Sequence, residues 1–577
     1  MKRYIHSFIL LGALCLTNVS CSDFLTEEDK VDIEKSDFLN SADEAETVLL
    51  GVYQATIGDA MYGMNLSFYF NMGTDCEQVE GNTTENFRIV PTNAYPTTQA
   101  EVEDAWQGLY VGIYRANDFL ERLSAKIDAY SEDDKNLATI YMGEARALRA
   151  MFYFELVRRF GHVPLFTTTT MSYQDPAEIV QEDPVKVYEQ IEADLKYAID
   201  VLPYATDDTY RTDNSFRFSK GAAMGLLAKV YATWAGNPIN DTSKWEQAAK
   251  VAGSLIMSGK HDLLTNFEQL WKNTANGIWD PTESLIEISF YSPTTTGAAS
   301  DPCGRIGKWN GIKTTAIADT RGSCAGNVKV VHSFVLNWRA EDGVDQEHPD
   351  GTKGIVDLRR DLSIGNYRYD NSLGDGPILW AKGTSDTQQT ALTNDLDPTK
   401  KQKEKQNYTP AKWDVVKYVE SGNALINNDK SNVNWYFLRY ADVLLIYAEA
   451  LNEWKGGPTN EAYAAVNKVR RRAYGNPSST TACDLQAGLD QEGFRQAIRN
   501  ERAYELAFEG HRRMDLVRWG IYYETVQQTY NELVNNWWSS ANYVVQKYTV
   551  KGKHELMPIP QREMDLCKQF KQNPGWN

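Results

Sequence analysis

The 577-residue chain contains little cysteine and no excess of positive charge. Its seven cysteines form no C-x-x-C pair and no spacing typical of metal ligands, which excludes a disulfide framework and a zinc module. Acidic residues outnumber basic ones by 78 to 59. Because such a surface repels phosphate groups, the composition excludes nucleic acid as a partner and disfavours contact with anionic lipids.

Apolar runs of the roughly 20 residues needed to span a bilayer are absent. The chain nevertheless begins with two basic residues, a short apolar stretch at 4–16 and small residues before Cys21. This order is typical of a secretory signal peptide, and the cysteine after a small residue is the pattern of a bacterial lipoprotein. We predict that residues 1–20 are a lipoprotein signal peptide and that Cys21 is lipidated. A secreted protein without lipid is the alternative, since Asn18 stands where an aliphatic residue is usual.

Residues 21–40 are acidic and poor in core-forming side chains. Such a segment cannot bury enough apolar surface to order itself, so we expect a flexible lipidated tether. An acidic stretch after the lipidated cysteine often accompanies export to the cell surface. We therefore predict an outer-membrane protein that is lipid-anchored and faces the cell exterior, with anchoring on the periplasmic side as the alternative.

Helical periodicity dominates residues 41–264, which we assign to the N-terminal part of a helical-repeat core. Ser41 and Glu44 form a capping box at the start of the first helix. Gly161 should end the clearest helix, because glycine adopts the conformation that terminates helices. That helix is predicted at 143–160, and further helices are predicted from Pro184 and at 221–234.

Two helix pairs, at 225–256 and 440–469, place small residues at their crossing points and resemble degenerate tetratricopeptide repeats. Stacked pairs of this kind form a solenoid that holds a surface in place. The pattern predicts a mainly α fold, a tetratricopeptide-like helical-repeat solenoid. Residues 431–577 are assigned to the C-terminal repeat helices and closing segment of the same domain.

The middle of the chain, residues 265–430, is rich in Gly, Thr, Asp and Asn, and we predict a loop-rich, ligand-facing region. Short strands are expected at 284–290 and 329–335. Cys303 and Cys324 flank a glycine-rich loop and are the favoured disulfide pair. No cofactor is expected; the segment 342–351 has the oxygen ligands of a calcium loop, but a solvated acidic turn is favoured.

Known catalytic motifs are absent from the sequence, including Gly-x-Ser-x-Gly, His-Glu-x-x-His and the phosphate loop. The chain also contains Glu501, Glu505 and Glu509 at four-residue steps, beside arginines. A charged site is one interpretation of this ladder. Ion pairing that fixes the register of the helices is favoured. The sequence therefore predicts a protein that is not an enzyme.

Five segments resemble, in the same order, those of SusD/RagB outer-membrane lipoproteins. They are 106–117, the signature helix and its continuation at 143–165, 439–450, 501–520, and the closing Leu-Met-Pro-Ile-Pro and Gln-Asn-Pro-Gly-Trp motifs at 556–560 and 572–576. The resemblance implies a fold of about four tetratricopeptide-like helix pairs, with the loop-rich region packed on one side. It also implies a nutrient-binding lipoprotein of the Bacteroidetes type that caps a SusC-like TonB-dependent transporter in the outer membrane.

Sugar binding needs flat aromatic faces with polar groups beside them, and these are best sought in the loops. The segment around Trp309 brings together an indole, Arg305 and Asn310 in glycine-rich surroundings. In the family, loops at this position and near residues 65–100 line the glycan site. The remaining candidates come from that second stretch and are Tyr69, Asn71, Asp75 and Glu77. Trp338 and Trp380 rank lower.

Three functions remain compatible with the sequence. Capture of oligosaccharides for the transporter is favoured. A peptide-binding protein of the RagB kind is the first alternative, and a transporter cap or scaffold without its own ligand is the second. The sequence does not identify the glycan.

Overall fold

The computed structural model describes most of the chain, in residues 38–79, 86–170, 175–207, 216–290, 303–315, 323–341, 357–370, 376–379, 407–420, 429–476, 480, 483–536 and 545–576. Several predictions lie outside the described residues, namely the signal peptide, lipidation of Cys21, the acidic segment 342–351 and Trp380.

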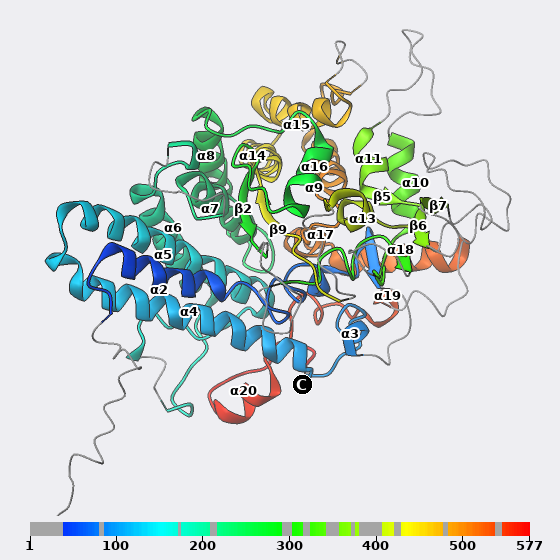
Figure 1. Cartoon of the computed structure of the whole chain (residues 1–577). Coiled ribbons are helices and arrows are strands. Elements are labelled where there is room, and N and C mark those ends of the chain that lie inside the picture. Colours follow the sequence, from blue (N-terminus) through cyan, green and yellow to red (C-terminus); the bar gives the residue numbers. More distant parts are fainter. Residues whose placement is uncertain are drawn as a thin grey trace, which may run out of the picture.

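The helical part is a continuous series of packed helices, which confirms the predicted repeat fold (Figure 1). Each helix packs on the next in the order α4, α5, α6, α7, α8 and α14, and both α15 and α16 pack on α14. Helix α2 packs on α4 and α5. The bounds of these helices are α2 Ala42–Gln54, α4 Ala100–Lys126, α5 Glu132–Phe160, α6 Pro184–Val201, α7 Lys220–Ala235, α8 Lys244–Met257, α14 Tyr440–Lys455, α15 Asn460–Ala473 and α16 Gln491–Glu505.

Local sequence determines where several of these helices begin and end. The Ser41 hydroxyl accepts a hydrogen bond from the Glu44 N–H at 3.3 Å, which confirms the predicted cap of α2. Pro184 is the first residue of α6, where its missing N–H costs nothing. Gly161 ends α5 at a φ of 68°. Helix α5 begins at Glu132, earlier than the predicted 143, because Ser131 caps it.

Small residues let neighbouring helices approach closely, as predicted. A Cβ atom at Gly112 of α4 would lie 2.6 Å from the ring of Phe152 on α5. A Cβ atom at Gly225 of α7 would lie 3.2 Å from Val443 on α14. Larger residues at these positions would therefore force the helices apart.

Short strands and helices, most of them from the chain after α8, form the part beside the solenoid. In this part, β2 pairs with β9, β1 with β4 and β5 with β8, all antiparallel, while β6 lies between parallel β3 and antiparallel β7. The strands are β1 Glu77–Val79, β2 Ser284–Ile288, β3 Thr314–Thr315, β4 Val328–Val330, β5 Ile364–Gly365, β6 Tyr367–Asp370, β7 Pro377–Leu379, β8 Thr409–Pro410 and β9 Trp435–Arg439. The helices here are α9 Phe267–Ala275, α10 His332–Glu341, α11 Leu358–Ser363 and α13 Val415–Tyr418.

The remaining helices are short or lie near the two ends of the described chain. They are α3 Asn86–Ile89, α17 Arg512–Arg518, α18 Tyr522–Asn536, α19 Val545–Tyr548 and α20 Gln561–Leu566, with the 3-10 helices η3 Tyr69–Asn71, η4 Ile127–Ala129, η6 Ala205–Asp207 and η7 Ala411–Trp413.

The predicted strand at 284–290 is confirmed by β2, but the strand at 329–335 is only partly correct. Strand β4 ends at Val330, and helix α10 begins at His332. Phe334 and Trp338 lie one helical turn apart and both pack on the ring of Tyr504. That contact favours helix over a continued strand.

The predicted disulfide between Cys303 and Cys324 is wrong, because both residues are buried as thiols. The segments around them have different backbone partners. Gly304, next to Cys303, bridges to Ser431, whereas Cys324 exchanges backbone hydrogen bonds with Thr314.

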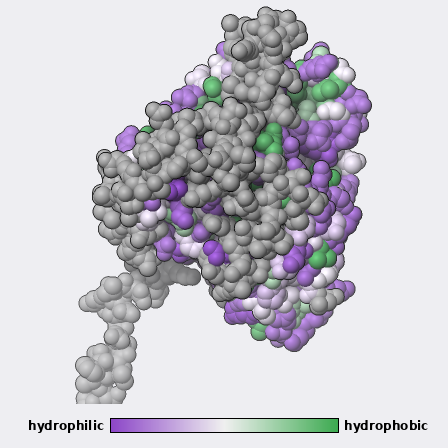
Figure 2. Space-filling view, turned by 90° about the vertical axis from the view of Figure 1, so that its right-hand side faces the viewer, coloured by the Kyte–Doolittle hydropathy of each residue, from purple (hydrophilic) through white to green (hydrophobic). Residues whose placement is uncertain are grey.

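Within the described residues, no helix is both long and apolar enough to cross a membrane. The described surface in Figure 2 is mainly hydrophilic, with apolar residues scattered over it.

Candidate functional site

The glutamates at 501, 505 and 509 lie inside the protein, where they pair with basic side chains from other elements. Glu505 accepts hydrogen bonds from Arg472 at 2.7 Å, from Arg439 at 3.0 Å and from Arg359 at 3.0 Å. Burial alone would raise the pKa of Glu505, but the charges of Arg472, Arg439 and Arg359 outweigh it and hold the pKa at about 2. These contacts support the structural interpretation of the ladder.

The basic partners of Glu505 come from distant segments, and the arginines next to the ladder have other partners. Arg502 instead pairs with Asp515 and Asp442, and Arg512 pairs with Asp75. The signature helix shows the same arrangement, since Arg149 of α5 donates two hydrogen bonds to the carboxylate of Asp194 on α6, at 2.7 and 2.8 Å. Ion pairs of this kind join one helix of the solenoid to the next.

The segment around Trp309 lies where three parts of the chain meet. The Arg305 N–H donates to the Gly63 carbonyl at 2.8 Å, and Gly304 bridges to Ser431. The Arg305 guanidinium pairs with Asp59 at 2.8 Å, and Lys430 reaches the same carboxylate at 3.2 Å. These contacts tie the loop to two distant segments.

Trp309 itself is half-buried and packs partly against the main core. The guanidinium carbon of Arg305 lies 4.8 Å from the centre of the indole ring. This geometry is a cation–π contact, which holds the ring in one orientation. An indole with fixed orientation, beside Arg305, Asp59 and Lys430, offers an apolar face together with hydrogen-bonding groups.

The other sequence candidates lie deeper. Asn310 is buried, and its side-chain oxygen accepts a hydrogen bond from the Gly307 N–H at 2.6 Å, so that it shapes the turn before Trp309. Tyr69 and Asn71 are also buried, and the Asn71 oxygen accepts from Arg159 at 3.1 Å. Their burial favours a structural role.

Asp75 lies just before β1, and Glu77 is the first residue of that strand. Asp75 is part-buried and paired with Arg512 at 2.6 Å. Glu77 is buried in β1, where burial raises its pKa to about 8 although the charge of Lys412 lowers it. Trp338, the lower-ranked candidate, is buried and donates to Asp357 at 2.9 Å. Ligand contact by these residues stays a prediction.

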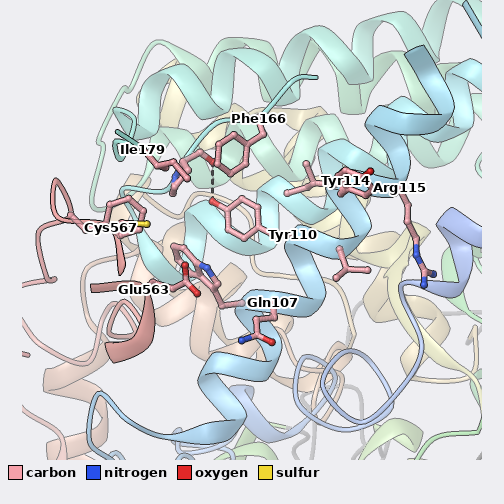
Figure 3. Close-up of a pocket in the computed structure, with 13 residues that line it drawn as sticks. Gln107, Tyr110, Tyr114, Arg115, Phe166, Ile179, Glu563 and Cys567 are labelled. Atoms are coloured by element: carbon pink, nitrogen blue, oxygen red, sulfur yellow. Dashed lines mark hydrogen bonds between the residues drawn. The ribbon is translucent and has the colours of Figure 1, made fainter. Parts of the chain in front are cut away.

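A second candidate site, which the sequence analysis missed, is an open pocket of about 520 Å³ between α4 and α20 (Figure 3). Five aromatic rings line it, and these are Trp106, Tyr110, Tyr114, Phe166 and Phe570. The first three recur at four-residue steps along α4, a spacing that puts them on one face. That spacing was visible in the sequence, but rings at helical spacing more often belong to a core.

Clusters of three or more His, Cys, Asp or Glu that could hold a metal ion do not occur among the described residues.

Comparison with known proteins identifies the family. Residues 282–576 match the family model for the SusD family, and residues 23–232 match a second model described as starch-binding associating with outer membrane. A crystal structure of a SusD homolog from Bacteroides thetaiotaomicron is 65% identical, with a TM-score of 0.88 over 95% of this chain and 100% of that one.

Two further relatives are more distant. SusD-like protein P25 of Formosa agariphila is 27% identical over 97% of each chain. A solved structure described as a laminarin-binding SusD-like protein is 24% identical, with a TM-score of 0.65 over 93% of this chain and 100% of that one, and shares the fold. Family models and relatives together span the described structure from α2 to its end, and the chain belongs to the SusD family.

Proposed function

We propose that this chain is a cell-surface lipoprotein that captures oligosaccharides and delivers them to a SusC-like TonB-dependent transporter, without chemistry of its own. The match to two models of one family, one of them described as starch-binding, is the observation that carries the proposal. The laminarin-binding relative, which has the same fold, supports a glycan as the ligand class.

Trp309 and its neighbours are the proposed contact site. The indole would stack on the C–H face of a sugar ring, while Arg305, Asp59 and Lys430 exchange hydrogen bonds with hydroxyl groups. These polar groups already pair with one another, so water or a sugar hydroxyl can replace part of a contact without leaving a charge uncompensated. Binding should be of modest affinity, roughly micromolar to millimolar, which suits a protein that must release its ligand.

A pair of matched variants tests the site. Purified wild type is first screened against a glycan array, and binding of the best glycan is then measured by calorimetry. Trp309→Ala should weaken binding by about tenfold or more. Trp454→Ala is the control, because this indole is also half-buried and has the Lys455 ammonium 3.3 Å from its centre, but it lies on α14. Equal affinity of both variants would exclude Trp309 as a ligand contact.

Parallel measurements address the other parts of the proposal. A peptide library screened beside the glycans separates the sugar-binding from the peptide-binding function. Incubation with the bound glycan should release no reducing ends.

Cys21→Ala should abolish surface display, and a surface-exposed mutant in normal amount would contradict the lipid anchor. Co-purification of a TonB-dependent transporter with the wild type tests the partner.

A further inference from the structure

The pocket between α4 and α20 is lined mainly by apolar side chains. Val111, one of the lining residues, is 46% exposed. Trp106 and Tyr110 lie 5.2 Å apart, and Tyr110 and Phe166 lie 5.7 Å apart between ring centres. A volume of about 520 Å³ lies within the range of small-molecule sites, roughly 300–1,000 Å³. A pocket with so few polar groups does not suit a sugar.

Most polar groups in the lining are already engaged with the protein. The Tyr110 hydroxyl donates to the Pro164 carbonyl at 2.9 Å, and the Gln107 amide donates to Glu103 at 3.0 Å. Arg115 lies at the far end, where its guanidinium turns away from the rings and donates to the Gly51 carbonyl at 2.8 Å (Figure 3). These groups hold the walls in place.

Glu563 is different, because its carboxylate lies at the α20 end of the pocket beside the rings (Figure 3). No side chain among the described residues donates a hydrogen bond to it. Its neighbour Arg562 forms an ion pair with Glu103 instead, at 3.4 Å. Burial raises the pKa of Glu563, Arg562 lowers it and the charge of Glu103 raises it further. The negative charge is therefore poorly compensated, and a cation placed there would be stabilised.

We propose that this pocket binds an aromatic ammonium compound, with its ring against the wall formed by Trp106, Tyr110 and Phe166 and its ammonium group at Glu563. The rings supply both apolar contact area and the electron-rich faces that attract an organic cation. The carboxylate accepts charge-assisted hydrogen bonds from the N–H groups. This site is separate from the proposed glycan site in residues, in place and in ligand class.

Tryptamine is a suitable probe, because it carries an indole ring and an ammonium group. Indole-3-propionate, which has the same ring and a negative charge, is its matched control. Calorimetry on the purified wild type should detect tryptamine binding in the millimolar range or tighter. Indole-3-propionate should bind at least about tenfold more weakly. Butylamine, which has the ammonium but no ring, should also bind more weakly than tryptamine.

Two variants on α20 locate the cation. Glu563→Gln should weaken tryptamine binding by about tenfold, the loss expected for one charge-assisted contact. Asp565→Asn makes the same change in net charge on the same helix, outside the pocket lining, and should leave tryptamine affinity unchanged. Both variants should keep the wild-type melting temperature, since the Glu563 side chain accepts no hydrogen bond within the described residues and Asp565 accepts only an exposed one from Gln561.

Three results would overturn the proposal. They are absence of tryptamine binding at millimolar concentration, equal affinity for tryptamine and indole-3-propionate, and equal affinity of the Glu563 and Asp565 variants. None of these results bears on glycan binding at Trp309, which is measured separately.

Discussion

Two glutamates that are equally shielded from water show how the helical solenoid differs from the strand region beside it. Glu505, at the end of α16, is surrounded by guanidinium groups, and its pKa is held at about 2. Glu77, in β1, is 4% exposed, and burial raises its pKa to about 8 although Lys412 lowers it. The solenoid therefore keeps its buried carboxylate charged at neutral pH, whereas β1 keeps its carboxyl mainly protonated. Burial has opposite consequences because the density of positive charge differs.

The largest effect should follow from loss of the Glu505 charge. Glu505→Gln would leave Arg359, Arg439 and Arg472 without their common carboxylate. We expect the free energy of unfolding to fall by about 3–5 kcal/mol, as for other buried pairs with one partner removed. Chemical denaturation followed by circular dichroism measures it, and a loss below about 1 kcal/mol would show that the network is dispensable.

The pH dependence of stability should separate the two glutamates next. The raised pKa of Glu77 means that its contribution to stability is complete below its unfolded pKa of 4.5 and is lost as pH rises toward 8. The depressed pKa of Glu505 means the opposite, a contribution complete above 4.5 and lost as pH falls toward 2.

Glu77→Gln tests this sign. Between pH 5 and 8 the variant should gain stability relative to wild type, by at most about 1.4 kcal/mol per pH unit. Melting temperatures of both proteins across this range provide the measurement. Glu287, whose pKa burial raises to about 7, remains in both proteins, so that the difference reports Glu77 alone. Parallel curves would show that Glu77 does not titrate in this range.

A smaller effect on stability is expected in the loop region around Trp309. Arg305 and Asp59 keep 18% and 33% of their side-chain surface exposed, so Arg305→Ala should cost less than about 1 kcal/mol. Its effect on glycan binding should be larger, a loss of roughly three- to tenfold, because the guanidinium holds the indole in place. Denaturation and calorimetry on the same preparation compare the two. A loss of stability without a loss of affinity would assign Arg305 to the fold.

The smallest effect is expected for an exposed pair. Glu524 and Lys551 retain 51% and 67% of their side-chain surface, and solvent screens their attraction. Glu524→Gln should therefore leave the melting temperature unchanged within error. A measurable loss would mean that the contrast between buried and exposed ion pairs is weaker in this protein than we infer.

Local features of the fold could be predicted from the sequence, because their causes lie within a few residues. The cap at Ser41, the start of α6 at Pro184 and the end of α5 at Gly161 are examples. The ladder at 501–509 was correctly assigned to structure, but its partners were not found. Arg359, Arg439 and Arg472 lie far from it in the sequence, and the spacing of glutamates carries no information about them.

The candidate site was harder to predict for the same reason. Asn71, Asn310 and Glu77 are polar residues in loop-like sequence, which usually indicates exposure. For Asn71 and Glu77 the neighbouring groups come from elsewhere in the chain, Arg159 for Asn71 and Lys412 for Glu77. Trp309 was identified from its glycine-rich surroundings, and the structure adds Asp59 and Lys430, which no motif connected to it.

The segment after residue 556 completes helices that were made much earlier in synthesis. The Met557 N–H donates to the Arg159 carbonyl at 2.7 Å, and the Asn573 amide donates to the Phe160 carbonyl at 3.0 Å. Because a ribosome builds the chain from its amino terminus, some 400 residues are translated between the end of α5 and these donors. The carbonyls at the end of α5 have these partners only after that. A product that stops before residue 556 would keep every repeat helix and still lack this closure. Proteolytic sensitivity near Phe160 is therefore a measure of whether the last part of the chain has folded.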